Sequence, residues 1–315
     1  MSSLDGWSPL DGWDGWDGWQ QRVPSTSTLW LALTHTRERL VAPMPEQGAS
    51  AVPERPACGD AVFSLPEQTR VQLATMDLLS KFRVARGATA REVTVTDVDA
   101  KHLLTLSAPS DEAFTNDLPK VEAWATQRRE RSAEILNQLS YNPAFWSVIL
   151  PLSPQRTPRT LELMEVWVAV CSYLVQSCKV LFNLPRPSQW SPRIQPMIAV
   201  PGYSTFPGGH AAESHLLALG LTELLKAANG QATTARIETA AGLMKALASR
   251  IAANRVVAGI HFTLDSDAGQ QLAEALLAPV MAAGLQNENA GDSVYAQLWQ
   301  AARAEWMPRD CTRAV

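Results

Sequence analysis

Two cations occupy core-facing positions on two predicted helices, where a charge is costly to bury. In residues 157–183 an apolar stripe with three- and four-residue steps is continued by Lys179, and in residues 234–257 a second stripe is continued by Arg255. A cation on a buried face is unfavourable unless an anion meets it, although a long side chain near a helix end can also reach water. The two positions together favour an anion held between the helices.

Neighbouring residues suit the same anion. Arg186 follows the end of the first helix, and its guanidinium can bind an oxyanion through two parallel N–H groups. Gly208 and Gly209 open the next predicted helix, whose first backbone N–H groups attract negative charge and can approach a ligand closely. His210, one of only five histidines, comes directly after them.

His261 and Asp265 lie four residues apart at the start of a further predicted helix. At this spacing the carboxylate can accept a hydrogen bond from one imidazole nitrogen and leave the other nitrogen free as a nucleophile or ligand. A plain helix N-cap is the alternative role for Asp265.

Taken in order, these groups resemble the three motifs of the type 2 phosphatidic acid phosphatase and vanadium haloperoxidase superfamily. They read KVLFNLPRP from Lys179, PGGH from Pro207 and RVVAGIHFTLD from Arg255, within a motif core of about residues 146–276. The order, the internal spacing and the chemistry all match the family pattern. The wider text RPSQWSPRIQPMIAVPGYSTFPGGHA is most similar to the soluble haloperoxidase branch.

The resemblance implies a role for each matching residue. Three cations would hold the equatorial oxygens of phosphate or vanadate: Lys179, Arg186 and Arg255. His261, oriented by Asp265, would be the nucleophile that becomes phosphohistidine in a phosphatase, or the ligand to vanadium in a peroxidase. His210 would be the acid–base group on the opposite side of the anion.

The chain departs from the family pattern at two positions. Gly208 replaces the serine of P-S-G-H, and the lost hydroxyl would weaken oxyanion binding by about 1.5–3 kcal/mol. Backbone N–H groups of Gly208 and Gly209 are expected to compensate. Asn254 replaces the serine before the arginine, a milder change because it lies outside the three cations.

The hydrophobic pattern predicts an all-α helical bundle, which the resemblance also implies. We expect helices over about 65–85, 118–140, 157–183, 209–228, 234–257 and 261–284, and a single strand at 91–99. In the second of these helices Val121, Trp124, Ile135 and Leu139 share one face. Gly230, Gly259 and Gly284 stand where helix ends favour glycine, and Pro279 is expected to kink the last helix.

Composition divides the chain into a tail and a domain. Residues 1–60 hold four Asp-Gly-Trp repeats and a proline-rich stretch, and we expect a disordered low-complexity tail and linker there, followed by a helical domain at 61–310. A net charge of −4 gives no sign of a nucleic-acid partner, and four scattered cysteines indicate neither a disulfide framework nor a zinc site. The remaining histidines, His35, His102 and His215, are expected to be structural.

The first twenty residues lack the basic and apolar pattern of a secretory signal, and charged or polar residues interrupt the most apolar stretch. We therefore expect no transmembrane segment and a cytoplasmic location, with a homo-oligomer compatible with the sequence.

The predicted function is that of an enzyme with an oxyanion site. The first hypothesis is a vanadium-dependent haloperoxidase, which uses vanadate as cofactor and oxidises a halide with hydrogen peroxide for transfer to an organic acceptor. The alternative is a phosphomonoester hydrolase without a cofactor, which acts on a phosphate ester through a phosphohistidine. A third hypothesis, favoured by Gly208, is a degenerate member that binds an oxyanion without turnover.

Overall fold

A computed structural model describes residues 58–229, 234–285 and 293–307. The predicted tail and linker therefore lie outside the described residues except for residues 58–60, as do His35 and Gly230. The contacts divide the chain after Ala61, and the helical bundle lies in the second unit, from Val62 onwards.

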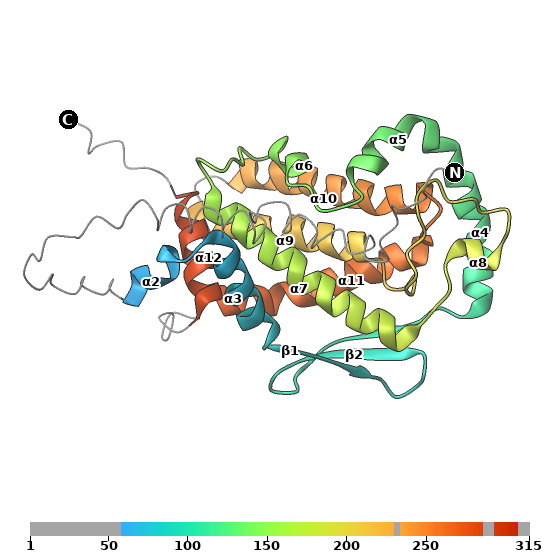
Figure 1. Cartoon of the computed structure of the whole chain (residues 1–315), viewed down its shortest axis with the longest axis horizontal. Helices are drawn as coiled ribbons and strands as arrows, with labels where there is room; N and C mark the ends of the chain where they lie inside the picture. Colours follow the sequence, from blue (N-terminus) through green and yellow to red (C-terminus); the bar gives the residue numbers. More distant parts are fainter. Residues whose placement is uncertain (1–57, 230–233, 286–292, 308–315) are drawn as a thin grey trace, which may run out of the picture. The chain divides into compact units, whose positions relative to one another are not determined.

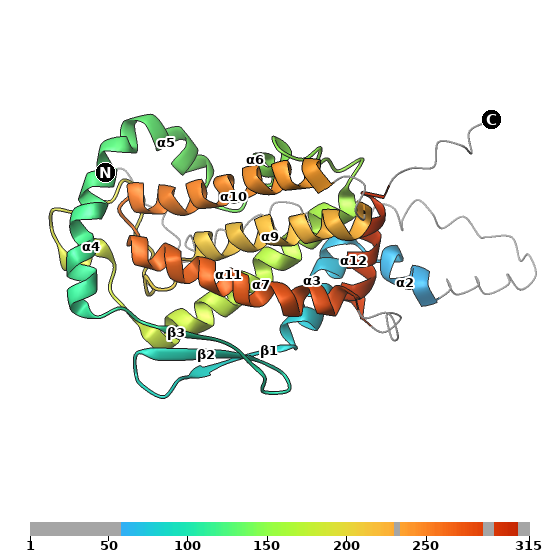
Figure 2. The same cartoon turned by 180° about the vertical axis from the view of Figure 1, so that it is seen from behind.

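Four long helices form the body of this unit. They are α7 (Pro158–Phe182), α9 (Gly209–Asn229), α10 (Thr234–Val257) and α11 (Thr263–Leu285). The four helices lie side by side along the long axis of the bundle, as both the front and the back view show (Figures 1 and 2). Helix α9 contacts each of the other three. The bounds agree with the predicted helices to within about two residues. The prediction of an all-α bundle is confirmed.

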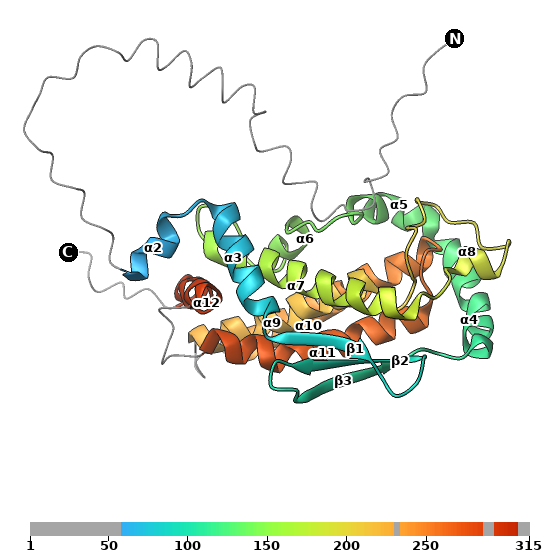
Figure 3. The ribbon, with the colours of Figure 1, turned by 60° about the horizontal axis from the view of Figure 1, so that its bottom comes forward.

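Shorter helices cover the two ends of the bundle. Helices α3 (Glu67–Leu79) and α12 (Val294–Ala304) pack on α7 at one end, while α4 (Asp111–Trp124), α5 (Arg128–Asn137) and α8 (Pro187–Trp190) lie at the other (Figure 3). Two further short helices are α2 (Cys58–Ser64) and α6 (Ala144–Ser147).

The helix predicted over 118–140 is wrong in its continuity. The 3-10 turn Ala125–Gln127 separates α4 from α5, and α5 ends at Asn137. Leu139, predicted on the buried face, lies beyond that end and is 40% exposed, whereas Gln138 is buried in its place.

The prediction of a single strand was incomplete. The strands β1 (Phe82–Arg86), β2 (Glu92–Asp97) and β3 (His102–Ser107) form an antiparallel sheet in which β2 is central. The residues of β1 had been included in the first predicted helix. Only β2 has the alternation that predicted a strand; β1 and β3 form beside it because a hairpin partner and the flanks of α7 and α11 cover them.

Local signals account for the ends of α7. Thr157 stands at its N-cap and Pro158 at its first helical position, as predicted, and Asn183 ends it in the left-handed region at φ 49°. Gly259, with φ +80°, ends the turn after α10 as predicted.

Gly284 has a different role from the one predicted. It lies inside α11, where a Cβ atom would come within 2.5 Å of the Trp299 ring, so this glycine makes room for α12 instead of ending a helix.

One stretch among the described residues, 158–190, which contains α7, is long and apolar enough to cross a membrane by length and composition. Its most apolar window of 18 residues has a mean hydropathy of 1.3. Half of that window is buried inside the bundle, and core helices of soluble proteins have the same character. The cytoplasmic location stays a prediction.

Candidate functional site

The predicted site residues come together at one end of the bundle. Lys179 lies in the last turn of α7, Arg255 in the last turn of α10, and Arg186 at the N-cap of α8. His210 lies in the first turn of α9, while His261 and Asp265 lie at the start of α11. Each of the three cations is only 2% exposed. Two helix C-termini and two helix N-termini thus meet around a buried positive cluster.

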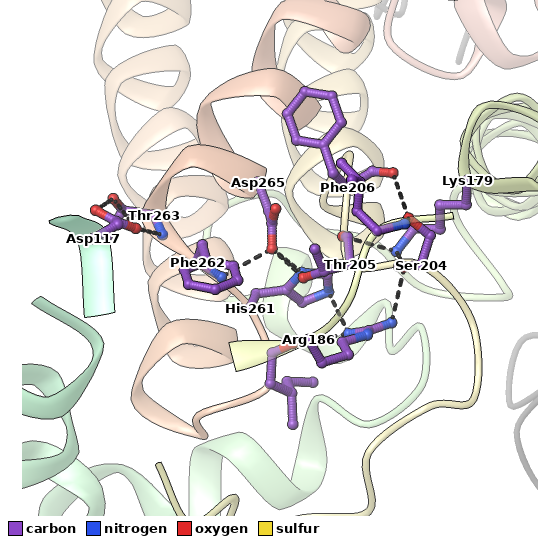
Figure 4. Close-up of polar contacts among 12 residues, drawn as sticks. Asp117, Lys179, Arg186, Ser204, Thr205, Phe206, His261, Phe262, Thr263 and Asp265 are labelled. Atoms are coloured by element: carbon purple, nitrogen blue, oxygen red, sulfur yellow. Dashed lines mark hydrogen bonds and ion pairs between the residues drawn. The ribbon is translucent and has the colours of Figure 1, made fainter. Parts of the chain in front are cut away.

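Asp265 determines which nitrogen of His261 carries the proton. His261 Nδ1 lies 2.8 Å from Asp265 Oδ2, and the same oxygen accepts from the backbone N–H of Phe262 at 2.9 Å and from the hydroxyl of Thr205 (Figure 4). A carboxylate oxygen can only accept from Nδ1, so Nδ1 holds the proton and Nε2 carries a lone pair. Asp265 therefore orients the imidazole, and the alternative role as a plain N-cap is wrong: α11 begins at Thr263, so Asp265 lies inside its first turn and accepts from the N–H of Phe262, the residue before the helix.

Nε2 of His261 faces the cations. Arg186 Nη1 lies 3.2 Å from it and also donates to the carbonyl of Ile260 at 2.9 Å. The remaining contacts of Arg186 hold it on a loop that precedes α9, where it donates to the carbonyls of Tyr203 and Ser204.

The same loop holds Lys179. Its Nζ donates to the carbonyl oxygens of Ser204 at 2.8 Å and Thr205 at 3.2 Å (Figure 4). The ring of Tyr203 covers both cations, with Lys179 Nζ 5.0 Å and Arg186 Cζ 5.2 Å from its centroid. Backbone carbonyls and an aromatic face thus hold two cations without neutralising either.

Arg255 has capacity left for a ligand. Its Nη2 donates to the carbonyl of Ile135 at 3.0 Å, but its Nε is buried and has no hydrogen-bond partner among the described residues. A buried guanidinium N–H without an acceptor is costly, and an oxyanion between the cations would supply that acceptor. The cluster therefore fits a tetrahedral anion such as phosphate or vanadate.

Burial and mutual repulsion lower the pKa values of the cluster. Burial, then the charge of Arg186, holds the pKa of Lys179 well below its usual range, and burial lowers the pKa of Arg255 to about 10. The pKa of His261 is held well below its usual value by burial and then by all three cations. Without an anion the imidazole is therefore neutral at pH 7, and the lone pair of its Nε2 accepts a hydrogen bond from Arg186 at 3.2 Å.

His210 is held from the other side. Its Nε2–H donates to the carbonyl of Gln138 at 3.0 Å, so in the neutral ring Nδ1 carries no proton. Burial, the charge of Arg255 and the proximity of His261 together lower the pKa of His210 to about 3. The two histidines predicted to act together are thus close enough to influence each other.

Gly208 corrects one expectation. Its backbone N–H donates to the carbonyl of Asp265 at 2.8 Å and therefore cannot compensate for a missing serine hydroxyl at the anion. A Cβ atom at this position would lie 2.9 Å from that carbonyl oxygen, so the glycine lets α9 meet α11 backbone to backbone. Gly209, the first residue of α9, has no acceptor for its N–H within the helix and stays a candidate for the anion.

Asn254 is more central than its place outside the cations suggested. The side chain is fully buried, and its Nδ2 donates to Gln138 Oε1 at 2.7 Å and to Glu134 Oε1 at 2.9 Å. These contacts anchor the end of α5, whose Ile135 and Gln138 carbonyls hold Arg255 and His210 respectively. The amide therefore ties both groups to one rigid support.

Several supporting groups were not found from the sequence: the Thr205 hydroxyl, the Tyr203 ring and the carbonyls at the end of α5. Thr205 and Tyr203 lie in an irregular loop without periodicity, and a carbonyl has no residue signature. Of the other histidines, His102 lies exposed on β3, and buried His215 contacts the Ala211 carbonyl within α9.

This end of the helical bundle buries three cations and a histidine oriented by a carboxylate, an arrangement that suits an oxyanion. Comparison with protein families agrees: the model of the PAP2 superfamily matches residues 163–288, which include every predicted site residue. This part of the chain is a PAP2 superfamily domain, from a group of phosphatase- and haloperoxidase-type enzymes. No curated protein matches the chain.

Proposed function

We propose that this protein is a phosphomonoester hydrolase that acts through a phosphohistidine at His261. The observation that carries the proposal is the pairing of a protonated Nδ1, held 2.8 Å from Asp265, with an unprotonated Nε2 that lies 3.2 Å from the buried cation Arg186. Such a nitrogen is an activated nucleophile directed at a site for a phosphate.

In the first step Nε2 of His261 forms a bond to phosphorus while the bond to the ester oxygen breaks. The equatorial oxygens lie among Lys179, Arg186 and Arg255, whose positive charges stabilise the transition state. The Nδ1–H of His261 stays hydrogen-bonded to Asp265, which stabilises the positive charge that develops on the imidazole.

The leaving alkoxide needs a proton, and His210 supplies it. The low pKa of free His210 is partly due to neighbouring positive charge, which a bound phosphate dianion offsets, so binding of the substrate favours the protonated form. Gln138 keeps the Nε2–H, which leaves Nδ1 as the nitrogen that exchanges the proton. In the second step His210 takes a proton from water, the water oxygen attacks phosphorus, the P–N bond breaks and phosphate leaves.

A vanadium-dependent haloperoxidase is the second candidate, favoured by the sequence around the motifs. The same three cations would hold vanadate beside His261 Nε2, and the bound vanadate would supply peroxide activation. We place it second because Glu213 lines the pocket beside His210, and its carboxyl group, whose pKa burial raises to about 7, opposes the approach of a halide when it is ionised.

Two assays of the purified protein separate the candidates. Hydrolysis of an aryl phosphate is measured with and without vanadate, and halogenation of a phenolic dye is measured with vanadate, bromide and hydrogen peroxide. For the hydrolase we expect phosphate release that vanadate inhibits, because vanadate imitates the transition state. Halogenation that rises with vanadate would instead establish the peroxidase.

His261→Ala should abolish phosphate release, and His210→Ala should slow it by roughly 10²–10⁴-fold. The matched control is His102→Ala, because His102 is exposed on β3. Neither activity in a folded protein would support the degenerate, binding-only hypothesis.

A further inference from the structure

An open pocket, whose empty volume of about 380 Å³ includes open solvent, lies beside His210. Its walls come from the segment between α5 and α7, from the first two turns of α9 and from Ile251 of α10. His210 is part of the wall, so the proposed acid–base group lies between the anion site and this pocket. The alcohol part of a bound ester, which leaves towards His210, would enter here.

The chemistry of the walls is distinctive. Three aromatic side chains line the pocket: Tyr141, Phe145 and Trp146. Among the residues that line it there is no lysine or arginine, and one carboxyl group is present, that of Glu213. This wall disfavours an anionic leaving group and suits a cation, since a carboxylate and aromatic faces both attract an ammonium group.

Glu213 is held in place one turn after His210. Its side chain hydrogen-bonds with Ser172 of α7 and interacts with the charge of Lys179. Burial raises the pKa of the Glu213 carboxyl group to about 7, and the neighbouring Ser172 and Lys179 do not offset this effect. An ammonium group of a ligand would provide a counter-charge and favour the ionised carboxylate.

Tyr141 adds a second unsatisfied group. Its hydroxyl oxygen is buried and has no hydrogen-bond partner among the described residues. A buried hydroxyl that lacks a partner is costly, and a ligand with N–H donors would satisfy it. The pocket therefore contains a carboxyl group and an unpartnered hydroxyl, both of which can accept a hydrogen bond from an N–H donor, and no lysine or arginine.

We infer that this pocket binds the alcohol part of the substrate and that Glu213 recognises an amino group on it. The substrates would then be phosphate monoesters of short amino alcohols. This inference rests on the proposed hydrolase function and assigns Glu213 a role in specificity, separate from the chemistry at His261.

The test compares 2-aminoethyl phosphate with propyl phosphate, which has the same chain length and a methyl group in place of the ammonium. For the unmodified protein we expect kcat/KM to be roughly 10–100-fold higher for the amino ester, the range expected for a charge-assisted hydrogen bond. Glu213→Gln should reduce this ratio to near one. The control Glu223→Gln lies on the same helix, exposed beside Lys226, and should retain the ratio.

Each failure has a distinct result. Equal or faster hydrolysis of propyl phosphate by the unmodified protein overturns the inference, and this comparison needs no variant to fold. Retention of the preference in Glu213→Gln overturns the assignment of Glu213. Absence of hydrolysis of either ester and of an aryl phosphate means that the proposed hydrolase function fails, and the substrate class with it.

Discussion

Replacing Gly208 with serine restores the residue that the family motif has at this position. From the motif alone, Gly208→Ser should add a hydroxyl donor to the anion site and strengthen binding of the oxyanion. The contacts around Gly208 lead to the opposite expectation, because they leave no space for any side chain.

The size of the effect follows from the distances. A Cβ at position 208 would lie 2.9 Å from the carbonyl oxygen and 3.1 Å from the carbonyl carbon of Asp265. These are backbone atoms, so no rotamer change can relieve the contact, and the Gly208 N–H bond to the same oxygen would have to stretch from 2.8 Å. Overpacking of this kind costs about 1–3 kcal/mol. The displaced residue is the one that orients His261, so the kcat should fall as well.

Thermal and urea unfolding measure the first effect, and phosphate release at saturating substrate measures the second. For a domain of this size we expect Tm to fall by about 2–4 °C per kcal/mol. Gly209→Ala is the matched control for packing, since its Cβ would make only ordinary contacts, 3.7 Å from Val175 Cγ1 and 3.9 Å from Glu213 Oε1. A Gly208→Ser protein that is as stable as the parent and more active would refute this reasoning.

Three further predictions concern the support, the charge and the ligand of the site. Asn254→Ala should destabilise the fold by about 1–3 kcal/mol in urea unfolding, because it leaves the buried side-chain oxygen of Gln138 without a donor. The same variant should lower kcat, since the end of α5 holds His210 and Arg255. An unchanged kcat would contradict the positioning role of Asn254. The pKa of His210 is about 3 in the folded protein against an ordinary value of 6.5, so the unfolded chain binds more protons between these two pH values. The free energy of unfolding should therefore fall as the pH decreases from 6.5 towards 3. The His210→Gln protein should lose less stability than the parent between pH 6.5 and pH 4, and an identical loss would show that His210 does not contribute. Millimolar orthovanadate or phosphate should raise Tm, because an anion relieves the repulsion among the cations and supplies an acceptor for Arg255 Nε. Arg255→Ala should remove most of this increase in Tm. An increase that persists in the variant would place the anion elsewhere.

The sequence by itself determined the long helices and the identity of the polar cluster. Periodicity, the Thr157–Pro158 start and the glycine at 259 are local features, so α7 and α10 could be predicted closely. Lys179 and Arg255 were recognisable because each interrupts an apolar stripe, and a charge at such a position requires a partner wherever the helices pack.

Only the tertiary structure decided how these residues are held. The N–H of Gly208 donates to the carbonyl of Asp265, and the missing side chain of Gly284 makes room for the Trp299 ring. The sequence had predicted a ligand contact for the first glycine and a helix end at the second. The strands β1 and β3 exist because their partners cover them. Asn254 reaches His210 only through Gln138, 116 residues away in the chain. For the two glycines and Asn254 the deciding contact joins different elements of the fold, and such contacts leave no periodic or spacing signal in either segment.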